Sequence, residues 1–124
     1  MPFHHEGNKR IGNEGENIAA AELLRHGCRI IERNFRCRIG EIDIIAEKDG
    51  ILIFVEVKTR RSARFGRPSE AVNWAKQQKI IKTSQSYLLY RKIENKPCRF
   101  DVVEVYIGPN QNNEISWIKN AFEA

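Results

Sequence analysis

The feature that most constrains the fold is the dipeptide Asp49-Gly50, which lies between two runs of β-forming residues. Asp-Gly is favoured in two-residue hairpin turns, because both central positions of a type I′ turn need a positive φ. Counting outward from this turn pairs Lys48 with Ile51, Ala46 with Ile53, Ile44 with Val55, and Asp43 with Glu56. The turn therefore predicts an antiparallel hairpin with a defined register.

The register also predicts which side chains lie together, because successive residues of a strand point to opposite faces. One face of the hairpin is apolar and carries Ile42, Ile44, Ala46, Ile53, Val55 and Val57. The opposite face carries Asp43, Ile45, Leu52, Phe54, Glu56 and Lys58. Two carboxylates and one ammonium group are therefore predicted on the same side of the sheet.

Two carboxylates that face each other on adjacent strands repel, and the pair destabilises the sheet unless something compensates. Apolar neighbours such as Phe54 predict partial burial, which raises the cost of bare charges. A divalent cation would compensate, and magnesium prefers oxygen ligands: one or two carboxylates, waters and phosphate oxygens. Lys58 would then position or deprotonate a water, or offset charge on a phosphate. The alternative is that Lys58 only neutralises Glu56 or Glu41, with Asp43 at a solvated strand end.

The rest of the chain shows helical and strand-like patterns. A helix is predicted over 13–26, with Asn13 and Glu16 as a capping box and Gly27 as the stop, and another over about 69–92, capped by Ser69. The residues expected to face the core are Ala20, Leu23 and Leu24 in the first helix, and Val72, Trp74, Ile81, Leu88 and Leu89 in the second.

Strands are predicted over 28–38, 39–48, 51–58 and 99–107, with a short edge strand over 115–118. This order predicts a single α/β domain spanning 1–124, in which helices cover a central mixed sheet. Its core is expected over about 12–118, and residues 1–11 are expected to be flexible.

The composition agrees with a folded domain, since 124 residues suit one domain and 41% of them are hydrophobic. The longest apolar run, 51–55, is too short to cross a bilayer, and the first thirty residues lack the apolar stretch of a secretory signal. We therefore expect a cytoplasmic protein. Cys28, Cys37 and Cys98 form no C-x-x-C pair, which favours buried free thiols over a zinc site.

The net charge of +5 suits an anionic partner such as nucleic acid. Two groups of basic residues stand out: Lys58, Arg60, Arg61, Arg64 and Arg67, and Arg29, Arg33, Arg36 and Arg38. A solvated basic surface is the alternative explanation for either group. The first group starts at the predicted site itself, where its loop would be placed to bind backbone phosphates.

Several motifs resemble those of a known superfamily. Ile42-Asp43, followed at a distance of thirteen by Glu56-Val57-Lys58, resembles the D-x(n)-E-x-K centre of the PD-(D/E)XK nucleases. Longer strings resemble the bacterial YraN family: Gly15-Glu16-x-x-Ala19, Arg33-Asn34-Phe35-Arg36, 40–46, 54–60, Pro68-x-Glu70-Ala71-Val72, Lys76-Gln77 and 99–103. That family is similar in motif order to the archaeal Holliday-junction resolvases.

The resemblance implies a restriction-endonuclease-like fold with the core order α-β-β-β-α-β. It implies that Asp43 and Glu56 bind Mg²⁺, with the backbone carbonyl of Val57 as a third ligand, and that Lys58 is the catalytic lysine. Mn²⁺ is the expected substitute for Mg²⁺. A homodimer is a further expectation from the resolvase likeness.

The resemblance adds two further residues to the catalytic set. Glu16 would be an additional acid that holds metal or its water, although a capping-box acid is the alternative. Gln77 would reach toward the site from the second helix, although an ordinary surface amide is the alternative. Asn73 stands where the family commonly has Asp, which weakens any carboxylate role there. For Asp101, which also matches, only a structural or peripheral role is expected.

These inferences together predict a Mg²⁺-dependent endonuclease that hydrolyses phosphodiester bonds in structured or branched DNA. The residues expected to bind the nucleic acid are Arg60, Arg61, Arg64, Arg67, Arg36 and Arg38. One alternative is a nucleic-acid-binding module with little or no turnover, which would bind without cleaving. Another is a purely structural domain, which would show neither a metal-dependent thermal shift nor binding to nucleic acid at low salt.

Overall fold

The computed structural model describes residues 4–61 and 72–124, with the side chains of 4–12 and of Gln111 outside the description. Helices and strands in this part follow one another in the order α1 (His4–Arg25), β1 (Arg29–Arg36), β2 (Glu41–Lys48), β3 (Ile51–Arg60), α2 (Trp74–Tyr90), β4 (Cys98–Tyr106) and β5 (Glu114–Phe122). A short 3₁₀ turn, Pro109–Gln111, precedes β5. The predicted α/β class and the core order α-β-β-β-α-β are confirmed.

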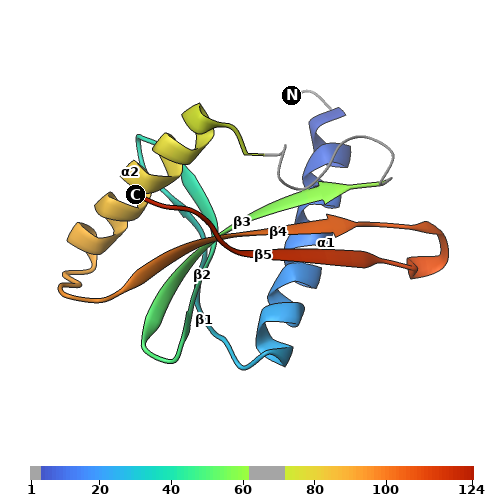
Figure 1. The fold of residues 1–124 in the computed structure, drawn as a ribbon. Helices are drawn as coiled ribbons and strands as arrows, with labels where there is room; N and C mark the ends of the chain where they lie inside the picture. The colour runs from blue at the N-terminus through green and yellow to red at the C-terminus, as the bar shows by residue number, and fades with distance from the viewer. Residues whose placement is uncertain (1–3, 62–71) are drawn as a thin grey trace.

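The strands form one mixed sheet in the order β1-β2-β3-β4-β5. Neighbouring strands are antiparallel except for β3 and β4, which are parallel and are connected through α2. Parallel strands need such a crossover connection, because a tight turn cannot bring the chain back in the same direction. The two helices lie on opposite sides of the twisted sheet (Figure 1).

Each helix covers its own hydrophobic core. Ala19, Ala20 and Leu23 of α1 pack in one cluster with the sheet residues Ile44, Ala46, Ile53, Val55, Val57, Val103 and Val105. On the other face, Ile80, Ile81 and Tyr87 of α2 pack with Phe35, Ile42, Ile45, Leu52, Phe54, Phe100 and Val102. Because both faces are covered, polar side chains between the layers are removed from water unless they lie near an end of the sheet.

The hairpin turn and its register are confirmed. Asp49 and Gly50 have φ angles of 53° and 78°, as a type I′ turn requires. The pairs Lys48/Ile51, Ala46/Ile53 and Ile44/Val55 occur as counted from the sequence. The ladder ends at Ile44/Val55, so the expected pair of Asp43 with Glu56 does not extend it.

The predicted start of the first helix was wrong. α1 begins at His4, so Asn13 lies inside the helix and does not cap it. Polar residues such as Lys9 and Arg10 are good helix formers, and apolar periodicity cannot detect a helical segment that lacks an apolar stripe. Leu24 was expected to face the core but is exposed.

The predicted limits of the second helix also need correction. Asn73 caps α2, because its side chain accepts a hydrogen bond of 2.9 Å from the backbone N–H of Lys76, and the helix ends at Tyr90. Ser69, the expected cap, lies outside the described residues. With this start, Trp74 and Leu89 point outward and are 72% and 81% exposed. The inward stripe consists of Ile80, Ile81, Thr83, Ser84 and Tyr87.

Two strand predictions were incomplete. Ile42 packs on the α2 side and not with Ile44, so the simple alternation of faces breaks between them, at Asp43. The last strand is longer than 115–118 and runs over Glu114–Phe122. Its second half packs against the sheet because Phe122 stacks on Phe100, with ring centroids 5.1 Å apart.

A glycine in α1 allows the helix to lie directly on β3. A Cβ atom added to Gly15 would lie 1.8 Å from the Thr59 Oγ1, which is far inside any permitted contact. The close approach places the next residue, Glu16, beside the part of β3 that carries Lys58. Gly15 therefore sets the distance between α1 and the sheet.

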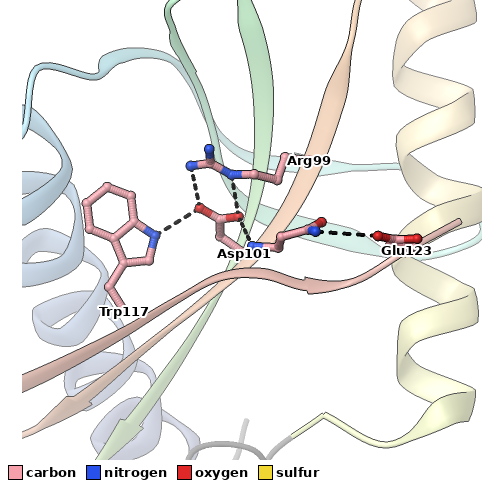
Figure 2. Close-up of polar contacts among 5 residues, drawn as sticks. Arg99, Asp101, Trp117 and Glu123 are labelled. Atoms are coloured by element: carbon pink, nitrogen blue, oxygen red, sulfur yellow. Dashed lines mark hydrogen bonds and ion pairs between the residues drawn. The ribbon is translucent and has the colours of Figure 1, made fainter.

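Asp101 on β4 joins β4 to β5 where their pairing shifts register (Figure 2). Its buried carboxylate accepts two bonds from Arg99, one from the Trp117 indole N–H and one from the backbone N–H of Asn120, all at 2.9 Å. The last bond replaces a ladder bond that the irregular pairing leaves unmade. The structural role expected for Asp101 agrees with these contacts.

We predict that Gly15→Ala destabilises the protein, although Gly→Ala in an exposed helix normally stabilises it by about 1 kcal/mol. The new methyl group overlaps Thr59, so α1 must move away from β3, at a cost of roughly 1–3 kcal/mol. Urea unfolding measures the change, and Asn17→Ala, at an exposed position of the same helix, is the control. In a Thr59→Gly background the cost of Gly15→Ala should shrink. A stabilising effect in the wild-type background would contradict the close contact.

We predict that Asp101→Asn lowers the free energy of unfolding by roughly 2–4 kcal/mol, because an amide accepts with one oxygen and leaves Arg99 without its counter-charge. The matched control is Asp49→Asn, the same chemical change at an exposed turn position where Asn also tolerates a positive φ. Equal unfolding midpoints for the two variants would rule out the proposed importance of the Asp101 network.

Candidate functional site

Asp43 lies where β2 and β3 stop pairing. Its Oδ2 accepts a hydrogen bond of 2.8 Å from the backbone N–H of Val57, beyond the last ladder pair of Ile44 with Val55. The N–H and C=O of one strand residue point toward the same neighbouring strand, so the Val57 carbonyl also points toward β2. The other carboxyl oxygen of Asp43 and this carbonyl oxygen therefore lie at the opening between the strands, where they could act as metal ligands.

Glu56 is buried, at 6% exposure, on the side of β3 that faces α2. Two ammonium groups lie near its Oε2: the Nζ of Lys58 at 3.8 Å and the Nζ of Lys76 at 3.5 Å. Both distances exceed those of a good N–H···O hydrogen bond, so the lysines provide charge without a tight bond. Lys58 and Lys76 are both partly exposed and can turn toward another anion.

The carboxyl group of Asp43 carries the clearest electrostatic signature of the site. Its pKa is raised from 3.8 to about 8, first because it is buried and next because the Glu56 charge lies close by. The bond from the Val57 N–H lowers the pKa and only partly offsets these effects, and the charges of Glu16 and Glu41 raise it further. Within 4–61 and 72–124, Asp43 therefore lies among carboxylates without a cation of its own.

Glu16 approaches this group from α1, one residue after Gly15. Its Oε1 is buried and has no hydrogen-bond partner among the described residues, where a guanidinium nitrogen of Arg33 lies 3.5 Å away. A buried carboxylate oxygen with no donor is unusual, because the loss of hydration is then not compensated. This is the position where a bound water or cation would supply the missing partner.

The residues present fit magnesium. Among the described residues no set of three or more His, Cys, Asp and Glu side chains converges to hold a metal alone. Magnesium needs no such set, because it usually keeps several waters and uses only one or two carboxylates with phosphate oxygens. Asp43, Glu56 and the Val57 carbonyl would hold it directly, and Glu16 would hold one of its waters.

Sequence reasoning missed two cations that lie at this site, Lys76 beside Glu56 and Arg33 beside Glu16. Both occur in motifs on which the family resemblance rests, but neither received a role. The first turn of α2 brings Lys76 to the sheet. Arg33 arrives through β1, opposite Ile44 of β2.

Among the described residues, Gln77 makes no hydrogen bond to the carboxylates of the site. Its amide donates a bond of 3.1 Å to the carbonyl of Val72, which holds the segment just before α2. A part in catalysis for Gln77 stays a prediction. Asn73 caps α2, a role that Asp at this position would also perform.

The predicted nucleic-acid-binding arginines differ in their surroundings. Arg60 donates a hydrogen bond of 2.9 Å to the buried carboxylate of Glu104. This ion pair within the sheet holds its guanidinium group away from a nucleic-acid partner. Arg36 bonds to Glu41 at 2.6 Å but stays exposed, as do Arg38 and Arg61. Arg64 and Arg67 lie outside the described residues.

The described cysteines are unpaired, as expected, and differ in exposure: Cys28 is buried, Cys37 is partly buried and Cys98 is exposed. The expectation of burial therefore holds for Cys28 alone. In the ranges 4–61 and 72–124 no helix is long and apolar enough to span a membrane.

A search of solved structures found the chain titled "The structure of Pyrococcus Furiosus SfsA in complex with Ca2+". The two chains are 20% identical with a TM-score of 0.40, and the match covers 94% of this chain and 65% of the other.

The sequence comparisons are much closer. UPF0102 proteins from Clostridium botulinum, Caldicellulosiruptor bescii and Symbiobacterium thermophilum are 51%, 50% and 50% identical to this chain. The alignments cover 96%, 92% and 94% of this chain and 98%, 98% and 99% of the relatives. The model described as "Uncharacterised protein family UPF0102" matches residues 15–105, which contain all the carboxylates of the site. The chain therefore belongs to UPF0102, which is the YraN family that its motifs predict.

Proposed function

We propose that this protein is a Mg²⁺-dependent endonuclease that cleaves phosphodiester bonds in structured or branched DNA. The observation that carries the proposal is the Asp43 carboxyl group, which is held by the Val57 N–H beside Glu56 and has a pKa raised to about 8. A buried carboxyl group such as Asp43, which has no cation beside it among the described residues, is costly in a purely structural site, whereas a metal centre uses such groups as ligands.

Each residue has a separate task in this proposal. Asp43 and Glu56 hold the metal, which when bound supplies charge for the scissile phosphate and a more acidic water. Lys58 lies 3.8 Å from Glu56 and offsets the negative charge that grows on the phosphate, or orients the attacking water. Lys76 keeps the buried charge of Glu56 partly compensated while no metal is present.

The surface around the site supports a nucleic acid as the substrate. Arg36, Arg38 and Arg61 are exposed, and the chain has a net charge of +5. Contacts from such side chains go to the phosphate backbone and give affinity that depends on salt more than on sequence. Selectivity would then come from the shape of the DNA.

One observation favours the alternative of a binding module with little turnover. Glu56 already has two lysine partners, so its charge is compensated without a metal. The carboxyl group of Asp43 has no comparable cation within the described residues, which is why we prefer the metal-dependent enzyme.

We predict that Lys58→Ala lowers the rate of Mg²⁺-dependent cleavage by at least 100-fold, a typical contribution of a positioned proton-transfer or charge-stabilising group. Asp43→Asn should abolish cleavage, because the amide keeps the bond from Val57 but binds the metal poorly. The substrates are branched, flapped and single-stranded DNA, with Mg²⁺ or Mn²⁺. Lys82→Ala, at an exposed position of α2, is the matched control.

Binding without cleavage under every condition would favour the binding module over the nuclease. Cleavage that persists in both Lys58→Ala and Asp43→Asn would show that it comes from another protein in the preparation.

A pH experiment tests the same carboxyl group without any substrate. Because its pKa is raised, the folded protein holds a proton on Asp43 that the unfolded chain has released between about pH 4 and pH 8. Stability in EDTA should therefore fall as pH rises through this window, and it should fall less in Asp43→Asn. Magnesium should raise the wild-type Tm more at about pH 8 than at about pH 5, because the cation competes with the proton. Parallel curves for the two proteins would contradict the carboxylate repulsion.

A further inference from the structure

A second feature, separate from the carboxylates, is a cavity of about 580 Å³ between the edge strand β1 and the C-terminal end of α2. Its lining includes the aromatic rings of Phe35 and Tyr90, the guanidinium groups of Arg36 and Arg91, and the polar side chains of Asn34 and Ser86. This volume lies in the range of ligand sites. The lining mixes aromatic surface, neutral hydrogen-bonding groups, the thiol of Cys37, the cations Arg36 and Arg91, and the carboxylate of Glu32, which pairs with Arg91.

Of the two aromatic rings in the lining, Tyr90 is open to solvent and Phe35 is buried in the core beside it. Tyr90 is 70% exposed, its ring centroid lies 6.5 Å from that of Phe35, and the Arg91 guanidinium lies 4.9 Å above its centre. A bond of 2.7 Å to Glu32 fixes Arg91 in this position. Aromatic rings and guanidinium planes of this kind stack on the faces of nucleobases with little dependence on base identity.

The polar side chains of the cavity, Asn34 and Ser86, can form hydrogen bonds with the edge of such a base. Asn34 stands at a positive φ of 57° on the edge strand, where its side chain is exposed, and Ser86 lies on the α2 side. An amide and a hydroxyl both donate and accept hydrogen bonds, so they suit the mixed edge of any base. Arg36 adds an exposed cation at the end of the cavity.

The sheet register links this cavity to the proposed metal site. Phe35 pairs with Ile42 and Arg36 pairs with Glu41, which are one and two residues from Asp43. Two residues of strand span roughly 7 Å and adjacent strands lie about 5 Å apart, so the end of the cavity formed by Phe35 and Arg36 lies within a few nucleotide lengths of Asp43. The influence of the Glu16 charge on the pKa of Arg36 agrees with this proximity. One strand of nucleic acid can therefore reach both places.

We propose that the cavity binds an unpaired nucleobase of the strand whose phosphate lies at Asp43. This inference rests on the proposed function and deepens it, because a base inside a duplex is stacked and paired and cannot enter such a cavity without being extruded. The substrate class is thereby narrowed to nucleic acid with a single-stranded segment beside the cleavage position.

The test compares binding of fluorescein-labelled oligothymidylate with binding of a blunt duplex, in EDTA at low salt. Tyr90→Ala should weaken binding of the single strand by roughly 5- to 100-fold, as the loss of one stacking aromatic does, and should leave duplex binding within about twofold. The matched control is Leu89→Ala, whose side chain is also exposed but does not line the cavity. Tyr90→Phe should retain binding, which separates stacking from any loss of fold.

Equal single-strand affinities for Tyr90→Ala and Leu89→Ala would overturn the proposal, as would binding of neither probe by the wild-type protein. Sedimentation of the same variants checks a rival role: a dimer lost in Tyr90→Ala, with unchanged single-strand binding, would assign the surface to a second copy and overturn the proposal.

Cleavage assays distinguish failure of the proposed base-binding cavity from failure of the proposed nuclease function. Metal-dependent cleavage with no effect of Tyr90→Ala on single-strand binding refutes the cavity alone. Binding that depends on Tyr90 without any cleavage supports the cavity and refutes the nuclease.

Discussion

The hydrogen bond from the Val57 N–H to the Asp43 carboxylate is the interaction on which the rest of the site depends. It closes the gap left where the β2–β3 ladder ends, and it does so with a side-chain carboxyl oxygen instead of a backbone carbonyl. A carboxylate in this position must lie close to Glu56, the residue before Val57. The hairpin thus holds two acids together through the same geometry that fixes its register, and α1 adds Glu16 because Gly15 lets the helix touch β3.

The charges around these acids are distributed unevenly. Glu16 has Arg33, and Glu56 has both Lys58 and Lys76, whereas the described contacts of Asp43 include only a neutral backbone N–H. A carboxyl group without a cation compensates by keeping its proton, which is the physical meaning of its raised pKa. A proton is a ligand that a metal can displace. The same imbalance that makes the ligand-free site costly is the reason why we propose a divalent cation there.

The sequence predicted what local rules determine and missed what only packing determines. The Asp49-Gly50 turn has one favoured geometry, so the pairing of Ile44 with Val55 followed by counting. Lys76 could not be found in this way, because it meets Glu56 only after α2 crosses the sheet between two parallel strands. The orientation of Trp74 was predicted wrongly for a related reason. The helix was expected to begin at Ser69, which changes the predicted inward face, whereas the helix capped by Asn73 directs Trp74 outward.

Burial alone does not mark a carboxylate as functional, and β4 provides the comparison. Asp101 is fully buried but receives four hydrogen bonds, two of them from a guanidinium group, so its charge is satisfied by the fold itself. Glu104 is equally buried, and its Oε1 accepts from Arg60 and Tyr106, although its Oε2 has no hydrogen-bond partner among the described residues. Removing such partners would only destabilise the protein. Asp43 differs because its partner among the described residues is one neutral N–H, whereas the acidic side chains of Glu56, Glu16 and Glu41 lie near it. This costly arrangement is the basis of the metal-dependent activity that we propose.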